Sequence, residues 1–166
     1  MLAAADLSLN VEKIDLRPSD LQLPKSLRAG IFGPSQSGKS HFIEQLLVHR
    51  DQLFQSTYAR ILLLSPNLSE DVGCLDVQAF KRHFSQIASP IPVLFLSYIP
   101  STAELQEEAV EVGARGQKIL VIADDFTTTI FDNGTIQDIL IRLSSKRGID
   151  LIFSAHSVAN GSTLGS

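Results

Sequence analysis

The amino-acid sequence predicts an α/β fold in which a mostly parallel sheet carries helices on both faces. Short β-rich runs alternate with stretches of helical period, and one run, residues 119–123, is apolar throughout, as in a strand buried on both sides. The chain has 166 residues, of which 44% are hydrophobic and 19% charged, and this suits one folded domain. We expect an extended lead-in at residues 1–25, the core at residues 26–158 and a polar tail at residues 159–166.

The predicted strands and helices follow one another regularly along the chain. The strands are expected at residues 27–32, 60–64, 93–96, 119–123 and 150–153, and the helices at residues 40–50, 76–87, 101–112 and 135–146. The third helix begins with a capping box, because Glu104 follows Ser101 by three residues. We interpret the apolar stripes of the helices as core packing.

Composition excludes several classes of protein. The net charge of −4 gives no overall attraction for nucleic acid, so a contact with DNA needs a local basic patch. Cys74 is the only cysteine, which excludes a disulfide framework and a metal cluster of cysteines. The N-terminus does not resemble a signal peptide, and no apolar run approaches the roughly 20 residues needed to cross a bilayer. We therefore expect an intracellular protein with no membrane span.

The segment between the first predicted strand and the first predicted helix fits the pattern G-x-x-x-x-G-K-[ST]. Glycines at its two fixed positions let successive N–H groups wrap phosphate oxygens, and the following helix adds its positive dipole end. Lys39 is expected to reach the β- and γ-phosphates, and the Ser40 hydroxyl to ligate Mg²⁺. A chance glycine turn is the alternative, but strand, loop and helix all agree with a P-loop for ATP and Mg²⁺. The predicted nucleotide-binding residues are Gly33, Pro34, Ser35, Gln36, Ser37, Gly38, Lys39, Ser40 and His41.

Two acidic residues end the apolar run at residues 119–123. An apolar strand with a carboxylate at its tip is the second half of a P-loop site. Asp124 is therefore expected to contact the Mg²⁺ held by Ser40, and Asp125 to orient or deprotonate the attacking water. The alternative is an aspartate pair that only caps the following turn.

The last predicted strand decides which division of P-loop proteins the chain resembles. Where a catalytic acid follows the metal-binding aspartate, an additional strand separates the P-loop strand from the acidic strand. Residues 150–153 are the only candidate, so we predict that this strand lies between the other two. His156 or Ser157 would then reach the γ-phosphate; a loop histidine without a ligand is the alternative.

With these motifs, the chain resembles the virus-type genome-packaging ATPases of the FtsK–HerA superfamily, and most of all those of Polintons, adintoviruses and poxviruses. The resemblance covers residues 27–158: the P-loop with its flanking Ile31-Phe32 and His41-Phe42-Ile43, the strand at 61–64, the acidic strand through Phe126, and residues 146–153. The family usually ends the last strand in glutamine or asparagine, whereas His156 and Ser157 stand here. It also continues for a further strand and helix, so the chain is expected to be a shortened member.

The resemblance implies an oligomeric motor, a homo-oligomeric ring that hydrolyses ATP with Mg²⁺ and moves duplex DNA, with viral or mobile-element proteins as further partners. It also implies an arginine supplied by a neighbouring subunit, for which Arg147, or else Arg142, is the candidate. One alternative is a reduced relative that binds nucleotide without motor activity. Another is a P-loop small-molecule kinase, which needs an arginine-rich lid that the sequence lacks.

Overall fold

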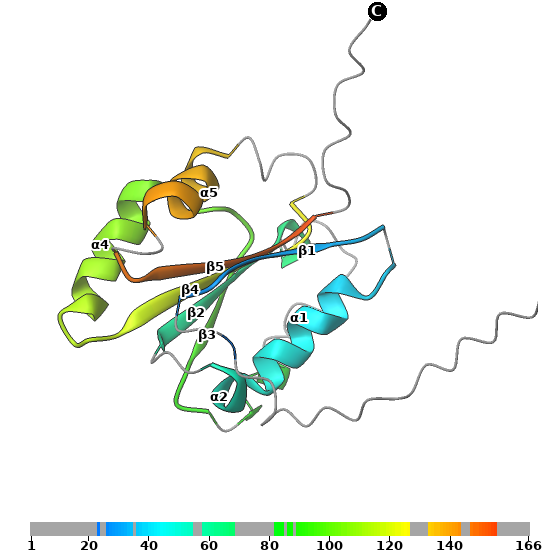
Figure 1. The fold of residues 1–166 in the computed structure, drawn as a ribbon. Helices are drawn as coiled ribbons and strands as arrows, with labels where there is room; N and C mark the ends of the chain where they lie inside the picture. The colour runs from blue at the N-terminus through cyan, green and yellow to red at the C-terminus, as the bar shows by residue number, and fades with distance from the viewer. Residues whose placement is uncertain are drawn as a thin grey trace, which may run out of the picture.

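A five-stranded, wholly parallel sheet forms the centre of the molecule (Figure 1). The computed structural model describes residues 23, 26–34, 36–54, 58–68, 82–84, 86–87, 89–126, 133–143 and 147–155. Within them the strand order is β1-β5-β4-β2-β3. The strands are β1 (Arg28–Phe32), β2 (Tyr58–Leu64), β3 (Val93–Leu96), β4 (Lys118–Ala123) and β5 (Ile149–Ala155). The predicted α/β fold is confirmed.

Strand β5, the last strand that the structure describes, lies between β1 and β4, the strands before the glycine-rich loop and the two aspartates, as predicted. On one side of β5, Leu151 pairs with Arg28 of β1, and on the other side Ile149 pairs with Ile119 of β4. No pairing joins β1 directly to β4. Strand β5 is also three residues longer than the sequence predicted, because Ile149, Ser154 and Ala155 continue its pairing.

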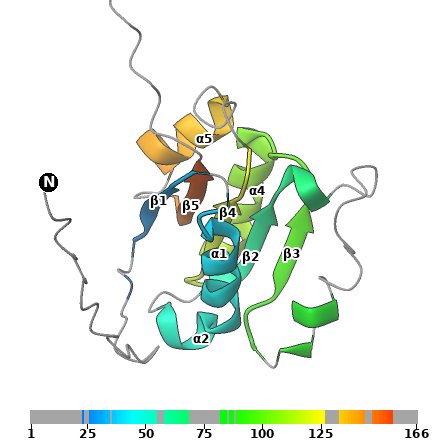
Figure 2. The same cartoon turned by 90° about the vertical axis from the view of Figure 1, so that its right-hand side faces the viewer.

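Helices cover both faces of the sheet, as Figures 1 and 2 show from two directions. One face carries α1 (Lys39–Val48) and α2 (Arg50–Leu53), and the other carries α4 (Thr102–Gly113), α5 (Gly134–Asp138) and the π-helix η5 (Ile139–Leu143). Alternate residues of each central strand enter opposite cores, as a pleated strand requires. In β2, for example, Ile61 and Leu63 pack on the α1 side, and Leu62 and Leu64 on the α4 side.

The helix ends agree with the sequence at α4 and differ from it at the last helix. Ser101 and Glu104 form the predicted capping box, in which each side chain accepts a hydrogen bond from the other residue's backbone N–H. The predicted helix at residues 135–146 is instead the short α5, which continues directly as η5. Ile139 and Leu143 are both buried, as the predicted apolar stripe of this helix implied, although the turn that joins them is a π turn.

Several predicted segments lie largely outside the described residues. Of the lead-in, only Leu23 is described, and it forms a parallel bridge to Phe54 away from the sheet. The helix predicted at residues 76–87 is described at residues 82–84, 86 and 87, where Phe84 is buried, and the tail is not described. Among the helices that are described, none is both long and apolar enough to span a bilayer.

A buried carboxylate joins three strands at the amino edge of the sheet. Asp150 of β5 is fully buried, and its Oδ2 accepts a hydrogen bond of 2.7 Å from the hydroxyl of Tyr58 in β2. The ammonium of Lys118 in β4 lies 3.5 Å from the same oxygen. Burying a charge is costly unless it is paired, so these contacts hold the three strand ends together.

Candidate functional site

The glycine-rich segment connects the carboxyl end of β1 to the first turn of α1, as the motif requires. The Gly33 N–H donates to the carbonyl of Ala155 at 3.3 Å, which continues the β1–β5 pairing into the loop. A Cβ at Gly33 would lie 2.6 Å from the hydroxyl of Ser37, so a larger residue there would have to displace the Ser37 side chain. Gly38 has φ of 88° and occupies the N-cap of α1 without a side-chain cap. The first N–H groups of α1 are thereby left to bind a ligand, and the helix dipole favours an anion.

Lys39 lies within the loop. Its ammonium donates hydrogen bonds to the carbonyl oxygens of Gly33 at 2.9 Å and of Pro34 at 2.8 Å. These bonds curl the side chain over the loop where phosphates are expected to lie. A point charge with three donors can exchange these carbonyls for phosphate oxygens.

One cavity of about 370 Å³ brings together the two predicted halves of the site. The tip of β4 supplies Asp124 and Asp125 to its wall, opposite the P-loop residues. The cavity lies at the carboxyl edge of the parallel sheet, where ligands bind in folds of this kind. Its lining comprises Gln36, Ser37, Gly38, Lys39, Ser40, His41, Asp124 and Asp125, all eight of which the sequence predicted.

The predicted Mg²⁺ ligands fit that ion. Ser40 and Asp124 both line the cavity, and both offer the oxygen atoms that Mg²⁺ prefers. Magnesium in nucleotide sites usually keeps several waters and takes only one or two protein oxygens, with phosphate oxygens as the other ligands. No group of three or more His, Cys, Asp or Glu side chains within the described chain could hold a metal unaided. A hydroxyl and a carboxylate are donors of the kind that suits a nucleotide-bound Mg²⁺.

The acidic turn is fixed by hydrogen bonds from both neighbouring strands. The Asp124 N–H donates to the carbonyl of Leu64 in β2 at 2.8 Å. The hydroxyl of Ser154 in β5 donates to Asp124 Oδ1 at 2.6 Å and accepts from the Asp125 N–H at 3.0 Å. Asp125 adopts a left-handed backbone with φ of 60°, which turns the chain sharply at this point.

The contacts of Ser154 and Asn67 are the part of the site that sequence reasoning missed. Ser154 is fully buried. Its position beside Asp124 follows from the strand register, because Ala123 pairs with Phe153 and each polar residue comes one position later in its own strand or turn. Asn67 lies in the short turn after β2 and donates from its side-chain amide to Asp125 Oδ2 at 2.9 Å. Polar residues at or shortly after the carboxyl ends of the parallel strands were the available signal, since those ends meet at one edge.

A second cavity of about 350 Å³ adjoins the first between α1 and the end of β2. Ser40, His41 and Asp124 line both cavities, whereas Asn67 and a set of apolar side chains line only this one. His41 lies 3.6 Å from Glu44, one turn along α1, and is largely exposed. The apolar walls are Ile43, Leu47, Leu63 and Leu68.

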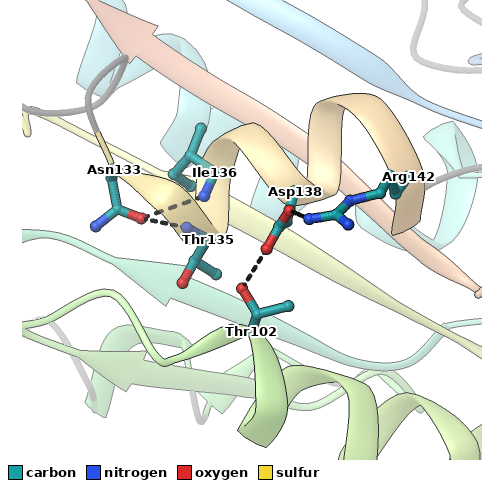
Figure 3. A network of polar contacts seen from close by, with 6 residues as sticks. All are labelled: Thr102, Asn133, Thr135, Ile136, Asp138 and Arg142. Carbon is teal, nitrogen blue, oxygen red and sulfur yellow. Dashed lines mark hydrogen bonds and ion pairs between the residues drawn. The ribbon is translucent and has the colours of Figure 1, made fainter.

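The predicted arginines lie elsewhere in the molecule. Arg147 is exposed in the turn before β5, at the opposite edge of the sheet from the P-loop, and lines a third cavity of about 430 Å³ between α4 and η5. Arg142 lines the same cavity and pairs with Asp138, which also accepts a hydrogen bond of 2.9 Å from Thr102 (Figure 3). The Arg142 and Thr102 hydrogen bonds lower the pKa of Asp138 below its ordinary value. Arg147 therefore does not reach the P-loop cavity of its own chain.

Other predicted site residues belong to parts of the chain that are not described. Gly33 and Pro34 take part in the P-loop through the contacts of Lys39, but Ser35 lies outside the described residues. The same holds for His156 and Ser157, which follow directly after β5. Their role at the γ-phosphate stays a prediction.

Comparison with known proteins adds no family assignment. No protein-family model matches the chain, and no curated protein matches it significantly. The resemblance to packaging ATPases stays a prediction.

Proposed function

We propose that this chain is a P-loop ATPase that hydrolyses ATP with Mg²⁺. The observation that carries the proposal is the position of β5 between β1 and β4, together with a second acid, Asp125, on the wall of the P-loop cavity. A second acidic residue beside the metal-binding aspartate supplies a base for water, which a hydrolase needs. The same strand order disfavours the small-molecule kinase alternative, in which β1 would pair directly with β4.

Each residue has a separate part in the proposed reaction. The P-loop N–H groups and the Lys39 ammonium bind the phosphates and stabilise the charge that develops on the transferred group. Ser40 and Asp124 would hold the Mg²⁺, which would neutralise phosphate charge. Asp125 orients the attacking water and accepts its proton. Ser154 keeps both aspartates in place through its two hydrogen bonds.

We further propose that hydrolysis drives the movement of duplex DNA by a homo-oligomeric ring inside the cell, together with viral or mobile-element proteins. The position of Arg147 is compatible with assembly, because its guanidinium is exposed at the edge opposite the cavity, where a neighbouring subunit could reach it. The positive charge needed to bind DNA would have to come from a local basic surface, since the net charge of the chain is −4.

Two measurements separate the motor from its alternative, a monomeric nucleotide-binding protein. The mass of the particle with and without ATP reports ring assembly, and the rate of ATP hydrolysis with and without duplex DNA reports coupling. A ring whose turnover rises with DNA supports the motor. A monomer that hydrolyses ATP at a rate independent of DNA leaves the ATPase in place and removes the motor.

A further inference from the structure

We propose that the face of the molecule formed by α4 and η5 binds the same face of a second copy of this chain about a two-fold axis. Helix α4 and helix α5, which continues as η5, lie side by side over one side of the sheet (Figures 1 and 2). The cavity of about 430 Å³ lies between them, and no residue lines both this cavity and that of the P-loop. A two-fold contact joins identical surfaces, so it differs from the head-to-tail contact that closes a ring.

One half of the contact surface is a basic groove. Arg142 and Arg147 line the cavity, and the side chain of Ile141 beside them is 75% exposed. Asp138 neutralises Arg142, as Figure 3 shows, but Arg147 has no ion-pair partner among the described residues. The groove therefore keeps a net positive charge next to an exposed apolar side chain. Arginine and apolar side chains in such an arrangement are typical of protein–protein interfaces.

The other half is an exposed row on α4 that borders this groove. Gln106 lines the cavity, and Val110 lies one helical turn beyond it with 66% of its surface exposed. Val110 belongs to a row of exposed residues that comprises Ala103, Glu107, Val110 and Ala114. Their spacing of four, three and four residues is that by which one helix packs along another. The row is therefore shaped to enter a groove beside a second helix.

The charges of the row and the groove complement each other. Within the part of the chain that the structure describes, Glu107 has no ion-pair partner, whereas its neighbours Glu108 and Glu111 are each paired with an arginine. Each chain thus offers one unpaired carboxylate on the row and one unpaired guanidinium, that of Arg147, in the groove. A two-fold axis brings Glu107 of each chain to Arg147 of the other, so that the ion pair forms twice.

Exposure and charge favour a second copy over duplex DNA as the occupant of the groove. The exposed glutamates of α4 would repel DNA phosphates, and a polyanion would leave Ile141 and Val110 uncovered. A second copy covers both apolar side chains, because the row of one chain carries Val110 into the groove that holds Ile141 of the other. Arg147 then meets Glu107 of the second copy in place of a neighbour's nucleotide, so the two arrangements exclude each other at this residue.

The test measures the mass of the full chain by sedimentation equilibrium without nucleotide. We expect a dimer whose dissociation constant Glu107→Arg raises about 30-fold or more, the usual effect of breaking a charge pair in an interface. Ile141→Asp should weaken the dimer likewise. Both residues are exposed in the single chain, so the melt of the dilute monomer should not change. Glu111→Arg is the matched control, because Glu111 is already paired with Arg115 on its own helix.

An exchange of charges identifies the pair. Glu107→Arg combined with Arg147→Glu should restore the dimer, because the ion pair is rebuilt with its signs reversed. A wild-type chain that is monomeric at every concentration measured overturns the inference, and salt-dependent binding of duplex DNA by that monomer would assign the groove to phosphates instead. A dimer that survives both single substitutions, that Glu111→Arg dissociates equally, or that the exchange does not restore also overturns it. No measurement uses ATP, so a dimer without ATPase activity removes the proposed function alone.

Discussion

Ser154→Ala tests whether the buried serine of β5 holds the two aspartates in their working positions. The substitution removes the donor to Asp124 Oδ1 and the acceptor of the Asp125 N–H, 2.6 and 3.0 Å away. A hydrogen bond to a charged group contributes about 1.5–3 kcal/mol. Asp124 is only half-buried, so water restores part of the loss, and we expect the variant to be destabilised by about 1–2 kcal/mol.

The stability change should be visible in a thermal melt. For a chain of this size each kcal/mol lowers Tm by about 2–4 °C, so the expected decrease is roughly 2–8 °C. Ser89→Ala is a matched control, because the Ser89 hydroxyl also donates to a carboxylate, that of Asp51, and accepts from a backbone N–H, that of Ile91. Ser89 lies away from the cavity and should leave turnover unchanged.

The functional readout is the Mg²⁺ concentration that gives half-maximal turnover. A partner that orients a metal ligand typically changes metal affinity or activity 10- to 100-fold when it is removed. We expect an increase of about 10-fold for Ser154→Ala and none for Ser89→Ala. A Ser154→Ala enzyme with the wild-type Mg²⁺ requirement would refute the positioning role of Ser154, whatever its Tm.

Three further predictions concern the phosphates, the acids and one ion pair. Lys39→Ala should weaken ATP binding at least about 10-fold in titration calorimetry with an unchanged melt, because within the described part of the chain Lys39 bonds to loop carbonyls alone; unchanged affinity would remove the P-loop assignment. Asp125→Asn should retain Mg²⁺–ATP but slow turnover about 100-fold or more, whereas Asp124→Asn should raise the Mg²⁺ requirement; identical magnesium titrations of the two variants would contradict these separate roles. Asp138, hydrogen-bonded to Arg142, has a lowered pKa in the folded state, so its contribution to stability is present above the ordinary value of 3.8 and is lost as pH falls through the lower folded value. The Tm difference between wild type and Asp138→Asn should therefore shrink at acid pH, and a constant difference from pH 7 to below pH 3.8 would show that the carboxylate charge has no part in it.

The fold was largely predictable because its determinants are local. An apolar run such as residues 119–123 can be satisfied only by burial on both sides, and the capping box at Ser101 marks a helix start without reference to the rest of the chain. The place of β5 between β1 and β4 followed from the acid after Asp124, which links the chemistry of the site to the strand order. The division of the last helix into α5 and η5 was not predictable, since a π turn has no distinct period in so short a segment.

The candidate site was predictable for residues that belong to a sequence motif with known chemistry. It was not predictable for residues whose role depends on which strands are neighbours in the sheet. Lys39 and Ser40 stand in a pattern with fixed spacing, so the sequence places them at the cavity. Ser154 and Asn67 are ordinary polar residues whose meaning depends on which strand ends are neighbours and in which register. That information exists only once the sheet has formed.

The three central strands β2, β4 and β5 are bonded across at both of their ends. At the amino edge, Asp150 joins Tyr58 and Lys118, and at the carboxyl edge the acidic turn joins Ser154 and the carbonyl of Leu64. Such a sheet resists sliding of one strand past the next, because any shift breaks buried polar contacts at two places at once. Mechanical work drawn from ATP would then have to appear as displacement of the turns and helices at the rim, with the sheet as the fixed frame against which they move.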